Sequence, residues 1–264
     1  SYEVTWLSAV PAIHQTALTR IKNNSNTKEY TKTLRFIRSC SSPLSPQTML
    51  EMENILNIPV LEAYGMTEAA HQMSSNPLEP GKRVPGSVGK GTNVDISIMD
   101  SEGNMLSNYE QGEIVIKGDN VINGYEDNPE ANASSFSNGW FRTGDEGIID
   151  NEGYIKIVGR IKELINKGGE KISPVEIDET LLLHPSVSEA VSFAIPHKTY
   201  GEEPSAAVVI KSPVTEKELI NHCKKSLALF KCPRSIKIVD SIPRTATGKI
   251  QRRIVAEKFS KIPE

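Results

Sequence analysis

The sequence predicts a mixed α/β fold: an α/β layer that leads into a β-barrel-like portion, followed by a small α+β domain. Three observations predict it. Strands alternate with helices in the first third, short strands separated by Gly- and Asn-rich turns fill residues 77–159, and capped helices return after Arg160. At ~150 residues per domain, the 264 residues correspond to about two domains.

The first third contains three predicted strands and two predicted helices. Pro11 precedes the first helix, whereas Ser45 as N-cap and Pro46 at the first helical position open the second. In chain order we expect an apolar run at 4–10, a helix at 12–21, a strand at 34–37, a helix at 46–56 and a strand from 59 to 65. This alternation favours a parallel sheet.

The middle third has the pattern of a barrel or meander. The sequences Asp-Ser-Glu-Gly at 100–103 and Asp-Asn-Glu-Gly at 150–153 are typical of hairpin corners. Short strands are predicted at 94–99, 112–117, 147–149 and 154–158. We expect this portion to pack on the preceding layer.

The last third begins two helices with capping boxes. Ser173 and Thr215 are each followed three residues later by a glutamate, Glu176 and Glu218. The first helix should end before the His-Pro pair at 184–185, and the second carries an apolar stripe of helical period. With strands expected at 190–195, 206–211 and 236–239, this region forms a domain of about a hundred residues, an ordinary size.

Composition excludes several classes of protein. The 30 basic and 33 acidic side chains nearly balance, which argues against binding nucleic acid through bulk positive charge. No apolar run approaches the ~18 residues of a membrane span, and the first residues lack a signal-peptide pattern. Three cysteines without C-x-x-C spacing argue against a disulfide framework or a zinc site. We expect a soluble, cytoplasmic protein.

Two motifs of the first domain carry candidate chemistry. The first, Tyr64-Gly65-Met66-Thr67-Glu68, stands at the end of a predicted strand, where α/β proteins bind ligands. Its aromatic ring could stack on a purine, its hydroxyl could hydrogen-bond a phosphate, and its carboxylate could bind Mg²⁺. A simple strand-to-helix turn explains the motif equally well.

The second motif, residues 140–145, ends in Gly144-Asp145. A carboxylate after a tight glycine turn could accept both hydroxyls of a ribose, or could be an ordinary turn aspartate.

Two further motifs follow. Residues 159–171 contain Arg160, suited to phosphate or ribose oxygens, and Gly168-Gly169, which allow close backbone approach; a solvated basic linker is the alternative. Residues 243–250 place Lys249 on a Gly/Thr loop, where it could stabilise developing negative charge or simply face solvent.

Together, in this order, the motifs resemble the acyl-adenylate-forming superfamily, which includes acyl-CoA synthetases, firefly luciferase and nonribosomal adenylation domains. The resemblance runs from Trp6 to Phe259. The ending Thr-Ala-Thr-Gly-Lys-Ile-Gln-Arg-Arg at 245–253 is similar to that of acyl-CoA synthetases. Residues 64–73, 76–83 and 159–174 look like the oxalate–CoA ligases of plants and fungi.

The resemblance implies a nucleotide site in the first domain. Ser41 and Ser42 would line the adenine pocket, where the family often has Gly or Ala. Within the first motif, Tyr64 would stack on adenine beside Gly65 and Met66, Thr67 would bind the α-phosphate, and Glu68 would coordinate Mg²⁺.

Other roles implied by the resemblance lie later in the chain. Asp145 would hold the ribose hydroxyls with Arg160 beside it, and Lys162 would be the hinge residue. Lys249 would bridge the acyl carboxylate and the α-phosphate. Gly168 and Gly169 would face the pantetheine arm of CoA.

His71, just after the first motif, is the candidate for the acid substrate. As a lone histidine it would ordinarily be a polar loop residue, but near an adenylate it could donate to the second carboxylate of a small diacid.

The chain departs from the superfamily in lacking its Ser/Thr/Gly-rich phosphate loop. Accordingly, residues 1–159 resemble the C-terminal portion of a large AMP-binding domain, 160–162 the hinge and 163–264 the small mobile domain, so that the N-terminal half of the same enzyme would be the missing partner. Some relatives are peroxisomal, but the last three residues are not a peroxisomal signal.

The expected function is that of an AMP-forming acid–CoA ligase, with ATP, Mg²⁺ and CoA as cofactors or co-substrates and oxalate as the favoured small carboxylic acid. A 4-coumarate-like aromatic acid or a medium-chain fatty acid is the alternative substrate. An inactive fragment that only binds nucleotide is the alternative of a different class, and a luciferase-like oxygenase is a weaker third.

Overall fold

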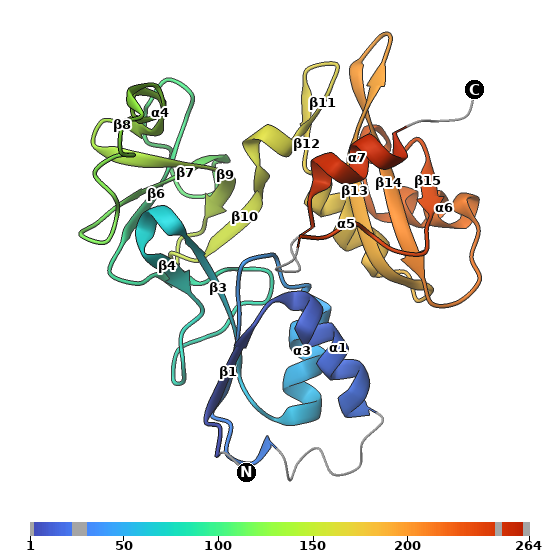
Figure 1. Ribbon diagram of the computed structural model, residues 1–264, viewed down its shortest axis with the longest axis horizontal. Coiled ribbons are helices and arrows are strands. Elements are labelled where there is room, and N and C mark those ends of the chain that lie inside the picture. Colours follow the sequence, from blue (N-terminus) through green and yellow to red (C-terminus); the bar gives the residue numbers. More distant parts are fainter. Residues whose placement is uncertain (1–2, 23–30, 246–249, 261–264) are drawn as a thin grey trace. The chain divides into compact units, whose positions relative to one another are not determined.

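The computed structural model describes residues 3–22, 31–245 and 250–260. The chain divides into two compact units, Ser1–Ile157 and Val158–Glu264, coloured blue to yellow and yellow to red in Figure 1. The expected mixed α/β class, with a β-barrel-like portion followed by a small α+β C-terminal domain, is confirmed.

The first sheet of the first unit has the strand order β1-β2-β3-β4-β5. Strands β1 to β3 are parallel, as predicted, whereas β4 and β5 extend the sheet antiparallel. The strands are β1 (Trp6–Ala9), β2 (Phe36–Ser39), β3 (Val60–Met66), β4 (His71–Ser75) and β5 (Lys90–Gly91), with the short 3-10 helix η1 (Thr67–Ala69) between β3 and β4.

Two helices pack against this sheet and form one apolar cluster with its strands. Helices α1 (Pro11–Lys22) and α3 (Pro46–Leu56) lie side by side in Figure 1. Leu18 of α1 and Met49 of α3 are buried with Ile37 and Val60 of the strands. Pro46 stands at the start of α3 as predicted, but the predicted cap is wrong in part, because the Ser45 side chain makes no capping hydrogen bond.

The second sheet has the order β10-β9-β7-β6, with β8 paired to β9. Its strands are β6 (Asp95–Met99), β7 (Gly112–Lys117), β8 (Phe136–Ser137), β9 (Trp140–Ile149) and β10 (Ile155–Arg160), with helix α4 (Pro129–Ser135) before β8. Phe141 and Ile114 are almost fully buried in the cluster beneath it. The predicted strand at 147–149 is only the end of the ten-residue β9.

The second unit is a sheet of order β12-β11-β14-β13, with β15 paired to β14. Its elements are η2 (Ile161–Glu163), β11 (Ile165–Lys167), β12 (Glu170–Ile172), α5 (Pro174–Leu182), β13 (Val187–His197), β14 (Gly201–Ile210), α6 (Glu216–Ser226), η3 (Leu229–Lys231), β15 (Ile236–Ile238) and α7 (Arg252–Phe259). The β11–β12 hairpin was not predicted.

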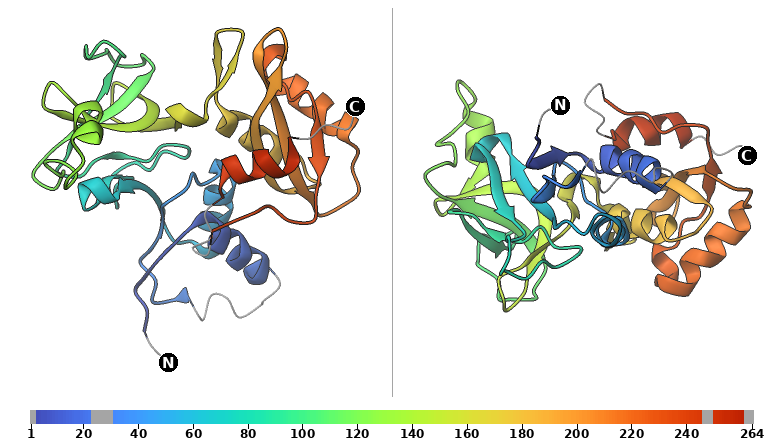
Figure 2. Two further views of the ribbon diagram at one scale, coloured as in Figure 1. Left: turned by 45° about the horizontal axis from the view of Figure 1, so that its top comes forward. Right: turned by 90° about the horizontal axis from the view of Figure 1, so that it is seen from below.

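Side chains of β13 and β14 alternate between two apolar clusters. Ala206 and Val208 pack with α5 and α6 on one face, whereas Ala207, Val191 and Phe193 pack toward Val255 of α7. Helices therefore cover both faces of this sheet (Figures 1 and 2).

The two predicted capping boxes differ in the structure. At α6 the box is complete: the Thr215 side chain accepts from the Glu218 N–H, and Glu218 accepts from the Thr215 N–H. At α5 only half of it forms. Ser173 accepts from the Glu176 N–H, but the Glu176 carboxylate lies 2.7 Å from the Lys231 ammonium instead.

None of the helices in the described part of the chain is long and apolar enough to cross a membrane.

Candidate functional site

Parallel strands β2 and β3 bring two of the predicted segments to one edge of the first sheet. Ser41 and Ser42 follow the end of β2, and Tyr64 to Met66 form the end of β3. Carboxyl ends of parallel strands share an edge, which is where α/β sheets bind ligands. Both serines are exposed, and Ser41 has a left-handed backbone with φ of 73°.

The first and second motifs meet through one hydrogen bond. The Tyr64 hydroxyl donates to Asp145 Oδ2 at 2.5 Å, and both residues are buried. They lie 81 positions apart in the sequence, Tyr64 on β3 and Asp145 on β9. The two candidate nucleotide-binding residues are therefore neighbours in the fold.

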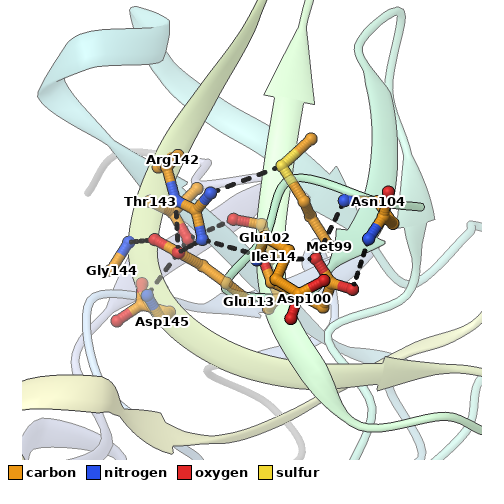
Figure 3. Close-up of polar contacts among 10 residues, drawn as sticks. All are labelled: Met99, Asp100, Glu102, Asn104, Glu113, Ile114, Arg142, Thr143, Gly144 and Asp145. Carbon is orange, nitrogen blue, oxygen red and sulfur yellow. Dashed lines mark hydrogen bonds and ion pairs between the residues drawn. The ribbon is translucent and has the colours of Figure 1, made fainter. Parts of the chain in front are cut away.

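A bulge in β9 places Asp145, where the sequence predicted a tight turn. The pairing register between β7 and β9 shifts between Glu113 and Val115, and Gly144 takes φ of 74°. Thr143 Oγ1 donates to the Ile114 carbonyl at 2.7 Å and accepts from the Asp145 N–H at 3.1 Å (Figure 3). The aspartate is thus set by strand pairing rather than by a loop.

Glu113 supports this bulge from the neighbouring strand. Its Oε1 accepts from the Gly144 N–H at 2.9 Å, and its Oε2 lies 2.6 Å from Arg142 Nη2 (Figure 3). Both side chains of this ion pair are largely buried. One carboxylate oxygen of Glu113 thus binds the Arg142 side chain and the other binds the Gly144 backbone, so the glutamate links the residues on both sides of the bulge to β7.

Thr67 and Glu68 form the 3-10 turn that follows β3. Thr67 is exposed, and Glu68 Oε1 accepts from the Tyr125 hydroxyl at 2.8 Å. Burial and the Glu68 carboxylate raise the pKa of Tyr125, so that phenol stays a donor at neutral pH. Mg²⁺ in nucleotide sites takes one or two carboxylates plus phosphate oxygens, and the partly exposed Glu68 carboxylate fits that donor set.

His71 opens β4 directly opposite the first motif. It pairs with Met66, and Gln72 pairs with Gly65. A Cβ on Gly65 would meet the His71 carbonyl oxygen at 1.5 Å, so only glycine allows these strands to approach. His71 is exposed with φ of 85° and begins a strand, whereas the alternative interpretation as an ordinary polar residue placed it on a loop.

A groove of about 630 Å³ lies along β1, β2 and β4, with His71 and Gln72 in its wall. Arg38 also lines it, and its guanidinium donates to Gln72 Oε1 at 3.1 Å and to Ser8 Oγ at 3.3 Å. The sequence motifs single out neither Arg38 nor Tyr125. A charged residue inside an apolar strand was the available signal for Arg38; nothing local marks Tyr125.

The second unit holds most of the remaining predicted residues. Arg160 ends β10 and Lys162 lies in η2, both exposed. Gly168 and Gly169 form the tip of the β11–β12 hairpin with φ of 61° and 99°, and the Gly168 N–H donates to the Tyr200 carbonyl at 2.8 Å. Lys249 lies outside the described residues.

Two family models match the chain. The model of the AMP-binding enzyme matches residues 1–126, and that of the AMP-binding enzyme C-terminal domain matches residues 176–249.

Among curated proteins, an oxalate–CoA ligase of Arabidopsis thaliana is 52% identical over 99% of this chain and 51% of its own length. An oxalate–CoA ligase of Saccharomyces cerevisiae is 50% identical over 98% of this chain and 48% of its own length. The chain therefore spans about half the length of the curated relatives it matches.

Two solved structures of CoA-ligase relatives are also similar to this chain. ATP-bound MatB from Rhodopseudomonas palustris is 35% identical with a TM-score of 0.90, over 97% of this chain and 51% of that one. The o-succinylbenzoate coenzyme A synthetase MenE from Bacillus subtilis, in complex with ATP and a magnesium ion, is 35% identical with a TM-score of 0.84, over 96% of this chain and 51% of that one.

Proposed function

This chain belongs to the AMP-binding enzyme family, and from that premise we propose that it serves an AMP-forming acid–CoA ligase. In the first half-reaction, a carboxylate oxygen attacks the α-phosphorus of ATP and pyrophosphate leaves, which gives an acyl-AMP. In the second, the CoA thiolate attacks the acyl carbon and AMP leaves. The observation that carries the proposal is the 2.5 Å hydrogen bond between Tyr64 and Asp145.

That bond supports a composite adenosine site. Tyr64 offers a ring for adenine, with Ser41 and Ser42 after the adjacent strand, and Asp145 offers a carboxylate to the ribose hydroxyls. Gly65 and Met66 carry the strand from Tyr64 to the phosphate-binding turn. A fused site of this kind is hard to explain if the two motifs are only ordinary turns.

The turn after β3 would bind the phosphates of ATP. The Thr67 hydroxyl would bind the α-phosphate, and the Glu68 carboxylate, oriented by Tyr125, would hold Mg²⁺. When bound there, the metal neutralises phosphate charge that would otherwise repel the attacking carboxylate.

The second unit would supply the mobile groups. Lys249 would offset charge on the carboxylate and α-phosphate during adenylation, and Arg160 would contact the ribose. Lys162 would be the hinge about which this unit turns between half-reactions. Gly168 and Gly169, at the exposed tip of their hairpin, would then face the pantetheine arm of CoA.

Oxalate is the acid that we propose. Two relatives at about half identity are oxalate–CoA ligases, and the groove beside the first motif contains one histidine and one arginine suited to a second carboxylate, His71 and Arg38. A 4-coumarate-like aromatic acid or a medium-chain fatty acid would need an apolar groove wall, and Trp6, Phe36 and Leu61 also line this groove. The choice of oxalate therefore rests on the two relatives and on the charge that His71 and Arg38 could offer to a second carboxylate.

Acid-dependent exchange of pyrophosphate into ATP tests this function on the whole protein. We expect exchange with oxalate above that with 4-coumarate or a medium-chain acid. Lys249→Ala should slow exchange by a hundredfold or more, on the order of what a lost electrostatic stabiliser costs, while sparing CoA transfer from supplied acyl-AMP. Equal loss in both half-reactions would remove the role of Lys249. Nucleotide binding without any exchange would instead favour an inactive nucleotide-binding module.

A further inference from the structure

Arg252 is a largely buried cation at an unfavourable position in its helix. It is the first residue of α7, where the helix dipole disfavours positive charge, and its side chain is only 14% exposed. Its neighbour Arg253 is in the same turn but 85% exposed. A buried arginine costs desolvation energy that an apolar residue would not, so its contacts need an explanation.

Those contacts join three separate elements of the second unit. Arg252 Nη1 lies 2.9 Å from Asp178 Oδ2 on α5 and donates to the Ser192 carbonyl of β13. Arg252 Nε donates to Glu163 Oε2 of η2 at 3.0 Å. Asp178 Oδ1 also accepts from the Ser192 N–H. Burial opposes the guanidinium charge, but the two carboxylates outweigh it and raise the pKa of Arg252.

The two carboxylates have different surroundings. The Asp178 side chain is 13% exposed and belongs to the packed interior, whereas the Glu163 side chain is 41% exposed. The interior contacts hold the guanidinium in place, and the bond to Glu163 adds little to the core. Its effect is to fix η2, the turn that contains Lys162, against the first turn of α7.

We propose that Arg252 is a positioning residue that ties α7 to the hinge turn η2 through Glu163. The inference rests on the proposed function, because Lys249 precedes Arg252 by three residues and Lys162 precedes Glu163 by one. A fixed relation between the two elements makes Gln251, the residue before Arg252, move together with η2. Losing it would misplace the lysine during adenylation, whereas CoA transfer makes no use of that lysine.

Glu163→Gln tests the link with little risk to folding, because this side chain is partly exposed. Glu257→Gln is the matched control: it removes the same charge from an arginine ion pair at the solvent-facing side of α7. We expect faster hydrogen exchange for Glu163→Gln at the amides of Leu164 and Val255, whose hydrogen bonds close η2 and the first turn of α7, and no change for Glu257→Gln. Arg252→Lys keeps the charge but loses the planar fork, and should resemble Glu163→Gln.

Kinetics of the whole ligase give the second measurement. Glu163→Gln should slow pyrophosphate exchange about tenfold, within the range that small misplacements cost, and leave CoA transfer from supplied acyl-AMP within about twofold. Pyrophosphate exchange by the double variant Glu163→Gln/Arg252→Lys should be no slower than exchange by Arg252→Lys alone. Unchanged hydrogen exchange in η2 and α7, or equal slowing of both half-reactions, would overturn the proposal. Altered hydrogen exchange in a protein that never shows acid-dependent activity would instead contradict the proposed function and leave the link standing.

Discussion

At the scale of single residues, His71 offers the most direct test of which acid the site binds. It faces the groove from the start of β4, and its pairing with Met66 puts it next to the turn that would bind the phosphates. Because an imidazole that hydrogen-bonds a second carboxylate contributes to binding of a diacid only, the nucleotide should be little affected by its loss.

We therefore expect His71→Ala to raise the KM for oxalate about tenfold, the cost of one charge-assisted hydrogen bond, and the KM for ATP by less than about twofold. Steady-state kinetics with each substrate varied in turn would measure both constants. A monocarboxylic acid serves as the control, since it has no second carboxylate for His71 to bind. If the oxalate constant does not move, His71 has no part in acid recognition.

Residue types near the site were predictable from the sequence, but their partners were not. Tyr64, Thr67 and Glu68 stand out as a strand-end motif because they belong to one short stretch, residues 64–68. The bond from Tyr64 to Asp145 depends on how β9 pairs with β7, and no local pattern reveals a bulge at Gly144. Side chains such as Arg38 and Tyr125 become relevant only once distant strands are paired.

At the scale of elements, the starts of α1, α3, α5 and α6 were predicted to within a residue, because helix starts depend on a few adjacent residues, whereas α4 and α7 were not predicted. Two serine or threonine caps illustrate the limit. Thr215 forms its complete box, whereas Ser45 makes no side-chain cap although Pro46 follows it as expected. At α5 a partner from outside the helix decides the outcome, because the Glu176 carboxylate binds the Lys231 ammonium instead of closing the box.

These two caps make a matched stability experiment. Thr215→Ala should lower the free energy of unfolding by about 1 kcal/mol, the usual cost of a lost N-cap, and Ser45→Ala by no more than a few tenths. Urea unfolding, monitored by hydrogen exchange of the amides in α6 and α3, would measure the loss of free energy of unfolding for both variants. A Ser45→Ala cost as large as that of Thr215→Ala would show that the cap geometry at α3 differs from the one described.

At the scale of the whole molecule, the change of sequence pattern near Arg160 predicts a division of the chain into a larger and a smaller body. Predicted boundaries at 159–162 lie near the division of the structure between Ile157 and Val158. The β11–β12 hairpin escaped prediction because its three-residue strands are too short and too polar to show an apolar alternation.

Because each unit has its own apolar clusters, we expect each unit to unfold as its own cooperative unit. Ile114 is fully buried in the cluster of the first unit, and Phe193 is almost fully buried in a cluster of the second. Replacing either by alanine removes buried apolar surface and leaves a cavity, at a cost of about 2–5 kcal/mol. If each unit folds around its own clusters, that cost should be confined to the unit that contains the substitution.

Native-state hydrogen exchange on Ile114→Ala, Phe193→Ala and the double variant would measure this. We expect Ile114→Ala to lower the opening free energies of amides in β7 and β9 only, and Phe193→Ala those in β13 and β14 only. In the double variant the two effects should add to within about 0.5 kcal/mol, as for distant independent sites. Strand β10 runs across the division, so its amides would report coupling first. Lowered protection in both units from either single substitution would mean that the two units unfold together and are not independently stable.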